Sequence, residues 1–557
     1  MMKKYISIAV CALAILPMTA QETYENARLM EEDLNGTARY VGMGGAMEAL
    51  GADISTITSN PAGIGMFRSS NISTSFGVVS QADGKDFRTG NKTNFSFDQL
   101  GFVYSTRTGR SSFLNVAFNY HKSRNFDYIL SAAAPLNGMG SQNGLSFVKG
   151  IGENYTKGEI AGSSRYNFNY DKGKGTHFAT SQLDNVYYNS FIISSDGCPY
   201  WNPASDFSMN RANTGYIGVY DFNVSGNINN RIYLGLTVGI HDVHYKGVSD
   251  YVETILDSDN QPVGNLVVSD EREITGMGYD VKAGVIIRPF EESAFRIGAS
   301  VSTPTFYKLT TKNHTYLTNN TVYNDMYNPR YVANDSYEFK LYTPWKFGLS
   351  MGHTVGTNLA LGASFEYADY GTADTRYITN TFYDEWSNTY QDDSESDNIM
   401  NTHTKETLKG VATLKLGGEF KPTKEISLRA GYNYVAPMYQ TEGFKNGFLD
   451  SAGSNSSSST DWVNWEATNR FTLGFGYRHN NFGIDLAYQY NTRKGTFYPF
   501  SGAHGEYNYY FVNDNGSIVK DDAGNTIIET EIVDINCPGV KVKDNRHQFL
   551  CTLTYTF

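Results

Sequence analysis

The sequence has few charged residues for its length, no cluster of lysine or arginine, and no long apolar run after residue 20. Charged side chains make up only 18% of the 557 residues, and the net charge is -12. This balance argues against nucleic-acid binding, which needs a basic surface. No apolar stretch of the mature chain approaches the roughly 18 residues of a membrane helix. If the mature chain spans a membrane, it must form a closed barrel, which satisfies every backbone group in lipid.

Cysteine is also scarce, and no Cys/His spacing is typical of a structural zinc site. Cys198 and Cys537 both stand in Cys-Pro segments, so a disulfide between two outer loops is a candidate in an oxidising compartment. Cys551 lies in a strand pattern. The chain has no G-x-S-x-G element in a helical context and no paired acid motif. We therefore expect no enzymatic activity, no metal and no cofactor.

The N-terminus has the pattern of a secretory signal. Lys3 and Lys4 precede an apolar segment, 6–16, that is too short to span a bilayer, and Ala20 offers a cleavage site before Gln21. We assign residues 1–20 to a signal peptide. A lipoprotein signal at Cys11 is the alternative, although the residues before it match such a signal poorly.

Alternating hydrophobicity dominates the rest of the chain. Around residues 232–240, large apolar side chains take every second position, and Gly and Thr take most of the others. Successive side chains of a strand point to opposite faces, so one face is apolar. The other face is rich in Gly, Ser, Ala and Asn rather than in Lys and Glu, which fits a narrow, partly filled lumen.

Counting these segments predicts an all-β fold: a transmembrane antiparallel β-barrel of about 14 strands over residues 70–557. Short and long connections alternate, as periplasmic turns and extracellular loops do, which places both termini in the periplasm. The final Phe557 resembles the C-terminal signal of bacterial outer-membrane barrels, so we expect partnership with the barrel-assembly machinery, outer-membrane lipid and lipopolysaccharide. The expected strands are 70–80, 97–106, 111–122, 215–227, 231–246, 274–289, 294–311, 336–352, 358–375, 406–421, 425–438, 467–479, 482–498 and 545–557.

Residues 21–69 do not alternate. The pattern over 22–34 is helical, and a stretch rich in Gly, Ala and Ser follows it. Small residues let the backbone pack tightly, and Gly permits unusual dihedral angles. About 45 residues can occlude such a barrel but cannot form an independent domain. We predict a short helical hatch that plugs the lumen.

This hatch resembles that of the FadL/TodX family of outer-membrane transporters for hydrophobic compounds. The resemblance rests on Gly42-Met43-Gly44-Gly45-Ala46, Ala49, Asp53 and Asn60-Pro61-Ala62-Gly63, in this order and spacing. A second similar segment is the hairpin over 413–434, with TLKLGGEFKP and ISLRAGYNY. Between about 125 and 335 only the strand rhythm is similar, and the insertion over 123–213 is long for the family.

The resemblance implies a monomeric barrel of 14 strands plugged by the hatch. It implies a hydrophobic ligand, such as a long-chain fatty acid, that enters between the long loops and diffuses passively inward. It also implies that the ligand leaves laterally, through a gap in the wall whose position the sequence does not give. The long insertion leaves the choice of ligand open.

Residues of the hatch are the first candidates for the ligand path: Gly44, Gly45, Asn60, Pro61, Ala62 and Gly63. Pro61 favours an extended conformation at Asn60. The Asn60 amide can then donate to the backbone of the wall, as a latch beside the path. A turn that merely ends a helix is the alternative.

Cations on the lumen face are the second candidates, because an arginine fork can hold the carboxylate of a fatty acid. The alternative is a structural pair, such as Arg429 with Glu419 on the adjacent strand, since a charge in a confined lumen needs a partner. The candidates are Arg296, Lys415, Arg429 and Arg478.

Two other functions stay open at this point. A haem receptor would use His241 with His244, or His121, as axial ligands. A structural or adhesive barrel without ligand would have a lumen filled by side chains. The transport hypothesis instead predicts an apolar pocket between the long loops and the hatch, with aromatic residues such as Tyr200, Trp201, Phe207 and Phe306.

Overall fold

The computed structural model describes residues 22–141, 162–167, 181–189, 192–193, 199–200, 203–257, 259–322, 330–385, 388–446, 449, 451, 456–500, 503–513, 515–535 and 537–557. The expected signal peptide, residues 1–20, and Cys198 lie outside this part of the chain.

Fourteen antiparallel strands form a closed wall, in which each strand pairs with the next and the last pairs with the first. Closure comes from the register between Asn71–Thr556 and Gln81–Arg546. The wall strands are β1 (Asn71–Gln81), β2 (Thr93–Arg107), β3 (Phe113–Asn125), β8 (Ala204–Ile228), β9 (Ile232–Leu256), β10 (Pro262–Ile287), β11 (Arg296–Ser302), β14 (Lys346–Val355), β15 (Leu359–Asp369), β18 (Gly410–Phe420), β19 (Ile426–Val435), β21 (Thr468–His479), β22 (Phe482–Tyr498) and β25 (Val540–Thr556).

The outer face of this wall is apolar. On β21, the side chains of Phe471, Leu473, Phe475 and Tyr477 are between 42% and 60% exposed, whereas Thr472 between them is buried. Most wall strands repeat this pattern with exposed Leu, Ile, Val or Phe. An apolar surface that runs around a whole barrel is stable in lipid and not in water. The wall is therefore transmembrane. Within the described residues, none of the helices has the length and apolarity needed to cross a membrane.

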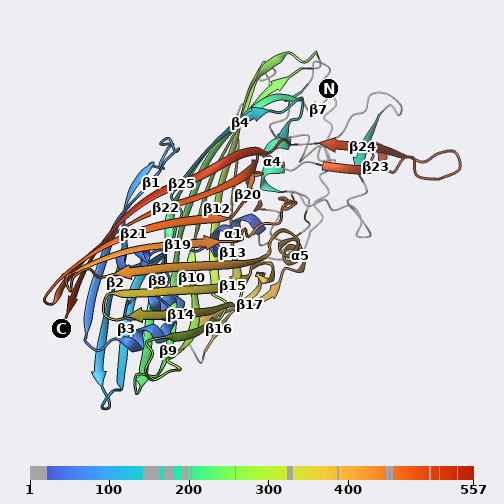
Figure 1. Ribbon diagram of the computed structural model, residues 1–557. Coiled ribbons are helices and arrows are strands. Elements are labelled where there is room, and N and C mark those ends of the chain that lie inside the picture. Colours follow the sequence, from blue (N-terminus) through green and yellow to red (C-terminus); the bar gives the residue numbers. More distant parts are fainter. Residues whose placement is uncertain are drawn as a thin grey trace.

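The two ends of the barrel differ. Short turns close the end at which the C-terminus lies, and the remaining elements gather at the other end, the long-loop end (Figure 1). These remaining strands are β4 (Tyr128–Pro135), β5 (Ser163–Asn167), β6 (Ile192–Ile193), β7 (Pro199–Tyr200), β12 (Phe306–Thr321), β13 (Arg330–Tyr342), β16 (Asp374–Asp384), β17 (Thr389–Ser396), β20 (Trp462–Trp465), β23 (Ala503–Asn513) and β24 (Ile528–Ile535). The helices outside the hatch are α4 (Gln182–Asn189), η4 (Tyr370–Thr372) and α5 (Asn398–Thr407).

The segment before β1 lies inside the barrel (Figure 1). It contains α1 (Thr23–Met30), α2 (Ala38–Gly42), α3 (Thr56–Ser59) and the 3-10 helix η1 (Pro61–Met66). Thr37 caps α2, because its side chain accepts from the Tyr40 amide. Apolar residues of this hatch, such as Val41, Met47 and Ile64, are almost completely buried.

Each predicted strand segment covers part of a wall strand, but three of them are interrupted. The segment 358–375 passes from β15 through the 3-10 helix η4 into β16. The segment 294–311 divides into β11 and β12 near Pro304, and 336–352 divides into β13 and β14 near Pro344. A proline has no amide hydrogen for the ladder, so the strand breaks there. Strands β8, β9 and β10 run for 25, 25 and 26 residues, well beyond their predicted ends.

The lipid-facing position of Leu473 gives a test of this orientation. Leu473→Arg, midway along β21, should lower the free energy of unfolding by about 2–4 kcal/mol, because a cation at mid-membrane loses its hydration. Phe482→Arg, at the strand end beside the short turn, should cost about 1 kcal/mol or less. Urea unfolding in lipid vesicles measures both. Equal costs at the two positions would contradict the placement.

Candidate functional site

A row of wall glycines receives the first hatch motif. Gly352, Gly362, Gly417 and Gly431 lie side by side on β14, β15, β18 and β19 through direct register pairs. A Cβ added to Gly431 would lie 2.2 Å from the amide nitrogen of Gly44. One on Gly417 would lie 2.2 Å from the Met43 carbonyl oxygen, and one on Gly362 would lie 1.9 Å from that of Ala46. The hatch backbone thus lies directly on the wall backbone.

Gly44 and Gly45 are themselves required by the backbone. Their φ angles are +64° and +81°, in the left-handed region that favours glycine. These angles turn the chain after α2 so that it follows the glycine row. The contacts of Gly44 are with Tyr432 and Leu416 of the wall.

Asn60 joins the second motif to the adjoining part of the wall, on β10 and β11. Its backbone is extended, with φ -143° and ψ 99°, as the following proline predicts. Its side-chain oxygen accepts from the Ala62 amide at 3.1 Å, while its amide nitrogen donates to the carbonyls of Val285 and Ala299 at 3.5 Å. The expected link from the Asn60 amide to the wall backbone is present, and the side-chain oxygen also caps η1. The role of Asn60 beside a ligand path stays a prediction.

Wall glycines again make room for this motif. A Cβ on Gly235 would lie 2.3 Å from the carbonyl carbon of Pro61, and one on Gly284 would lie 2.0 Å from the side-chain oxygen of Asn60. Gly235 and Gly284 are register partners on β9 and β10. Ala62 is fully buried, and Gly63 donates through its amide to the Asn60 carbonyl at 2.9 Å.

Three of the four predicted lumen cations contact protein groups. Arg429 pairs with Glu419 and with Asp485, both at 2.6 Å. Lys415 pairs with Glu48 of the hatch at 2.9 Å and with Glu366 of the wall at 2.5 Å. These contacts fit the structural alternative.

The other two predicted cations differ from each other. Arg296 donates to the hatch carbonyl of Leu50 at 3.0 Å. Arg478 is exposed at the short-turn end of β21, where its backbone amide donates to the Glu425 carbonyl. Carboxylate binding by these four cations stays a prediction.

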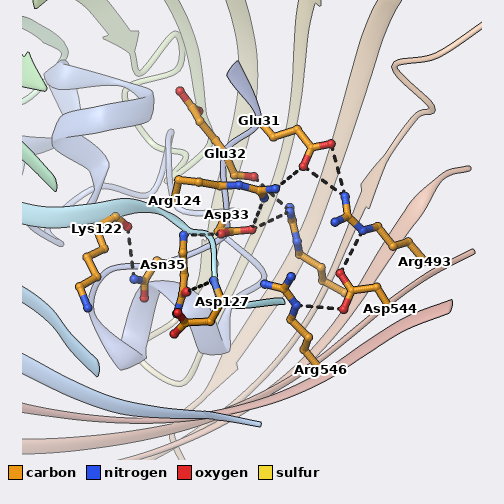
Figure 2. Close-up of polar contacts among 12 residues, drawn as sticks. Glu31, Glu32, Asp33, Asn35, Lys122, Arg124, Asp127, Arg493, Asp544 and Arg546 are labelled. Carbon is orange, nitrogen blue, oxygen red and sulfur yellow. Dashed lines mark hydrogen bonds and ion pairs between the residues drawn. The ribbon is translucent and has the colours of Figure 1, made fainter. Parts of the chain in front are cut away.

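Sequence reasoning missed the largest charged cluster, which lies where α1 ends (Figure 2). Glu31 contacts Arg124 and Arg493, and its oxygen lies 3.1 Å from the Arg493 guanidinium. Asp33 lies 3.0 Å from Arg124 and also accepts from the Asn125 amide at 2.9 Å. Three consecutive acids in a chain with so little charge were the available signal.

Further arginines complete this cluster from the wall. Asp544 of β25 receives Arg493 of β22 at 3.1 Å and its own neighbour Arg546 at 2.9 Å. Arg470 of β21 donates to the Glu32 carbonyl at 3.1 Å and to the Asn433 side chain at 3.1 Å. The hatch is thereby tied to β3, β21 and β22, and through Asp544 to β25.

A cavity of about 190 Å³ lies against this cluster. Seven Asp or Glu and seven Lys or Arg side chains line it, together with aromatic residues such as Tyr40, Tyr367 and Trp465. Polar and apolar groups contribute equally to its lining, so the pocket expected beside the hatch is of mixed character and carries many charged side chains. A second cavity of about 50 Å³ adjoins it and has more aromatic walls, including Tyr24, Tyr128 and Trp462.

Apolar side chains fill the lumen around α1. Tyr24 stacks on Tyr439 with ring centroids 5.3 Å apart, and Trp462 stacks on Tyr498 at 4.9 Å. Of the aromatic residues expected in the pocket, Phe207 is buried in a separate apolar cluster at the long-loop end. Phe306 packs on Tyr342. Trp201 and the side chain of Tyr200 lie outside the described part.

The histidines considered for haem are in different settings. His121 and His241 both line the charged cavity, whereas His244 is exposed beside Asp242. The ring nitrogens of His241 contact Asp280 at 3.1 Å and the Tyr307 hydroxyl at 3.1 Å. With both nitrogens engaged, this imidazole offers no free lone pair to iron.

The candidate disulfide involves a loop cysteine. Cys537 carries a free, half-buried thiol, and Cys198 lies outside the described residues, so the bridge stays a prediction. Burial raises the pKa of the Cys537 thiol to about 12. This thiol therefore stays protonated at neutral pH.

The hydrogen-bond ladder between β2 and β3 ends early. Towards the long-loop end, the last register pair between β2 and β3 is Gln99–His121. Strand β2 itself continues and pairs with β1 as far as Thr93. Beyond that point β3 shifts register against β8, and β4 follows it. The separated edges meet through Lys122, which donates to the Ser96 hydroxyl at 2.9 Å.

Asn35 of the hatch lies at this break in the wall. Its amide nitrogen donates to Asp98 of β2 at 2.9 Å and to the Lys122 carbonyl of β3 at 3.2 Å. Gln548 donates to its side-chain oxygen at 3.3 Å. One hatch side chain thus bridges two strands that are not paired with each other there. Figure 2 shows its contact with Lys122.

Comparison with known proteins gives matches among solved structures only. No family model matches the chain, and no curated protein does. A Pseudomonas aeruginosa FadL homologue is similar at 12% identity and a TM-score of 0.45, over 94% of this chain and 99% of that one. The monoaromatic hydrocarbon channel CymD is similar at 10% identity and a TM-score of 0.45, over 95% and 99%.

The Ralstonia pickettii toluene transporter TbuX is similar at 11% identity and a TM-score of 0.42, over 94% of this chain and 99% of that one. What the chain does is best inferred from its own wall, hatch and cavities.

The glycine row gives a test of how the hatch is seated. Gly431→Ala should displace the hatch and raise ion leakage, because the added Cβ would lie 2.2 Å from the Gly44 nitrogen. Single-channel conductance in planar bilayers measures the leak. Gly109→Ala is the matched control, because its Cβ meets only Ser112 at 3.4 Å, an ordinary contact. If Gly431→Ala conducts like the wild type, the hatch is not held by this contact.

Proposed function

We propose that the protein carries hydrophobic and amphipathic small molecules, with long-chain fatty acids as the type, across the bacterial outer membrane by passive diffusion. The break in the wall at β2 and β3 supports this proposal most directly. A closed ladder would allow only axial passage, whereas a break with a hatch side chain in it offers a lateral exit into lipid. A molecule with a long apolar part gains free energy by leaving in that direction.

The filled lumen agrees with this route. Apolar side chains around α1 and the tightly seated hatch fill much of the lumen among the described residues, which would hold back small solutes. A hydrophobic molecule can still advance by displacing side chains along an apolar path. We place the long-loop end outside the cell and both termini in the periplasm, and we expect a monomer.

The side chains at the break suit a seal that opens. Lys122 and Ser96 form one direct link between the edges, and Phe97 stacks on Tyr120 with centroids 5.7 Å apart. A second link runs through the hatch residue Asn35. Nearer the long-loop end, the Gln81 side chain of β1 donates to the Ile129 carbonyl of β4 at 2.7 Å and accepts from the Ile129 amide at 2.8 Å. Movement of residues 31–35 would remove the link through Asn35, so hatch position and wall opening are coupled.

Uptake by cells tests the proposal. Cells that lack the gene should take up labelled oleate several-fold more slowly than cells to which it is restored. The physical reason is that the two strains differ only in the path that this barrel provides through the outer membrane. Labelled glucose uptake, which uses other channels, serves as the control and should not change. Equal oleate uptake by the two strains would overturn the proposal. Haemin titration of the purified protein covers the haem alternative, which a Soret shift would support.

Cross-linking tests the lateral exit. With the native cysteines replaced, Ser96→Cys and Lys122→Cys joined by a short dithiol-reactive linker should abolish oleate uptake, and reduction of the linker should restore it. The physical reason is that the linker holds the two edges together. The control pair, Ser350→Cys with Ser364→Cys, joins β14 and β15, which are already paired. Uptake that persists with the edges linked would place the exit elsewhere.

A further inference from the structure

Three lysines lie together on the outer face of the wall, where β22 and β25 approach the long-loop end. Lys494 is the register partner of Lys543, and Lys541 stands two residues from Lys543 on the same face of β25. The side chain of Lys541 is 78% exposed, and the other two lysines are exposed as well. The two strands run side by side over this length (Figure 1). These three residues form one lysine patch on the outside of the barrel.

The level of the lysine patch in the membrane follows from strand geometry. Tyr555 packs on Phe482 at the short-turn end, with ring centroids 4.7 Å apart. Lys543 stands twelve residues before Tyr555 on the same strand. With a rise of about 3.3 Å per residue and a tilt of about 40°, the two positions are about 30 Å apart along the membrane normal. The apolar band of such a barrel is about 25 Å tall, so Lys543 lies at the level of the lipid head groups.

Aromatic rings mark the edge of the apolar band just below the patch. Tyr488 packs on Phe549 with centroids 5.0 Å apart, and its hydroxyl lies 2.8 Å from a ring nitrogen of His547. Tyr490 packs on the same imidazole at 5.1 Å. Rings with one polar end gather where hydrocarbon meets head groups. A lipid at this place would have acyl chains beside the rings and its head group beside the lysines.

The lysine patch has little negative charge around it. Among the described residues, no carboxylate lies within 4.0 Å of Lys494 or Lys543. Two acids flank the patch: Glu466 is 4.0 Å from Lys541, and Asp83 accepts from the Asn545 side chain at 3.1 Å. Like charges directly opposite one another on paired strands are destabilising. An anion that binds between Lys494 and Lys543 would relieve this repulsion.

A second pair of outward lysines at the long-loop end is arranged differently. Lys308 and Lys340 are register partners on β12 and β13. Lys308 lies 3.3 Å from Glu338 and 2.5 Å from Asp392, and Lys340 donates to the Asp392 carbonyl at 2.8 Å. The protein itself therefore supplies the negative charge for that pair. The lysine patch on β22 and β25 lacks such acids, which favours an anion from outside the chain.

We propose that the lysine patch binds the phosphate groups of an outer-leaflet lipid, the lipid A of lipopolysaccharide. Lysine binds phosphate as a point charge, and basic residues beside a membrane attract anionic lipids. Lipid A carries phosphate groups at the head-group level and acyl chains below, in the order in which the wall offers lysines and apolar side chains. This inference rests on the orientation given under the proposed function, with the long-loop end outside. It adds a lipid partner on the outer wall, away from the path through the lumen.

Binding of two matched lipids tests the site. Lipid A with both phosphate groups and its dephosphorylated form share their acyl chains, so the ratio of their affinities isolates the phosphates. The full-length protein is used in non-ionic detergent with EDTA, which removes divalent cations that could bridge phosphates to acids. We expect the phosphorylated form to bind more than about tenfold more tightly, at about a factor of five for each lysine. Salt should reduce this preference by screening. Native mass spectrometry measures the bound lipid.

Variants assign the preference to the lysine patch. Lys494→Gln, Lys541→Gln and Lys543→Gln combined should bring the affinity ratio close to one, whereas the three corresponding changes to Arg should preserve it. The control combines Lys308→Gln with Lys340→Gln, which removes outward lysines that the protein already neutralises, and should leave the ratio unchanged. The patch side chains are exposed, so these variants should keep the fold, which heat-dependent gel mobility checks.

The outcomes separate this site from the proposed transport. An affinity ratio near one in the wild type, or an unchanged ratio in the triple Gln variant, overturns the site. Equal binding of phosphatidylglycerol and lipid A overturns the assignment to lipid A, because the patch would then hold any anionic lipid. Oleate uptake by cells with the triple Gln variant should match the wild type. Uptake that is absent already with the wild-type gene counts against the proposed function alone.

Discussion

A charge enclosed in a narrow lumen must be met by an opposite charge, and the hatch of this protein is held in place through that constraint. Arg39 of the hatch meets Glu419 of the wall at 3.1 Å, and Glu48 of the hatch meets Lys415. Glu31 and Asp33 meet arginines of three strands. Each pair joins hatch to wall, so the plug cannot move without exposing charges on both sides. Removing one partner of such a pair costs roughly 3–5 kcal/mol.

Close backbone contact fixes where those pairs form. The glycine row of Gly352, Gly362, Gly417 and Gly431 lets the hatch approach the wall to van der Waals distance. The side chains of Arg39 and Glu48 then reach their partners Glu419 and Lys415 across the interface. With a methyl group at these positions, the hatch would stand further from the wall and the ion pairs would lengthen. The close packing of the two backbones therefore determines which ion pairs can form between hatch and wall.

Local pattern made the barrel predictable from the sequence. Alternation is a property of consecutive residues, so it locates Leu473 outside and Thr472 inside without any knowledge of neighbours. The same phase places Arg470 on the lumen face. The hatch was predictable because it lacks alternation and because its two glycine-rich motifs resemble those of a known family.

Contacts between residues that lie far apart in the sequence could not be predicted from it. The arginine cluster joins positions 31 and 33 to 124, 470, 493 and 546, and nothing in the local pattern says that these side chains meet. The glycine row depends on the register of four strands, and one-residue shifts would destroy it. The break between β2 and β3 depends on where two ladders diverge. For the same reason, the predicted cations Arg429 and Lys415 had no visible partners in the sequence beyond Glu419.

The position of the acids in the hatch links the ion pairs to the bridge across the wall break. Glu31 and Asp33 follow α1 directly, and Asn35, which bridges the wall break, stands two residues later. A rigid tie at residue 33 therefore fixes residue 35, since two residues span at most about 7 Å. When the ion pair at Asp33 breaks, Asn35 is no longer held and can move out of the wall break. The ion pairs that neutralise the wall arginines therefore also hold Asn35 in the break, so one set of contacts serves both purposes.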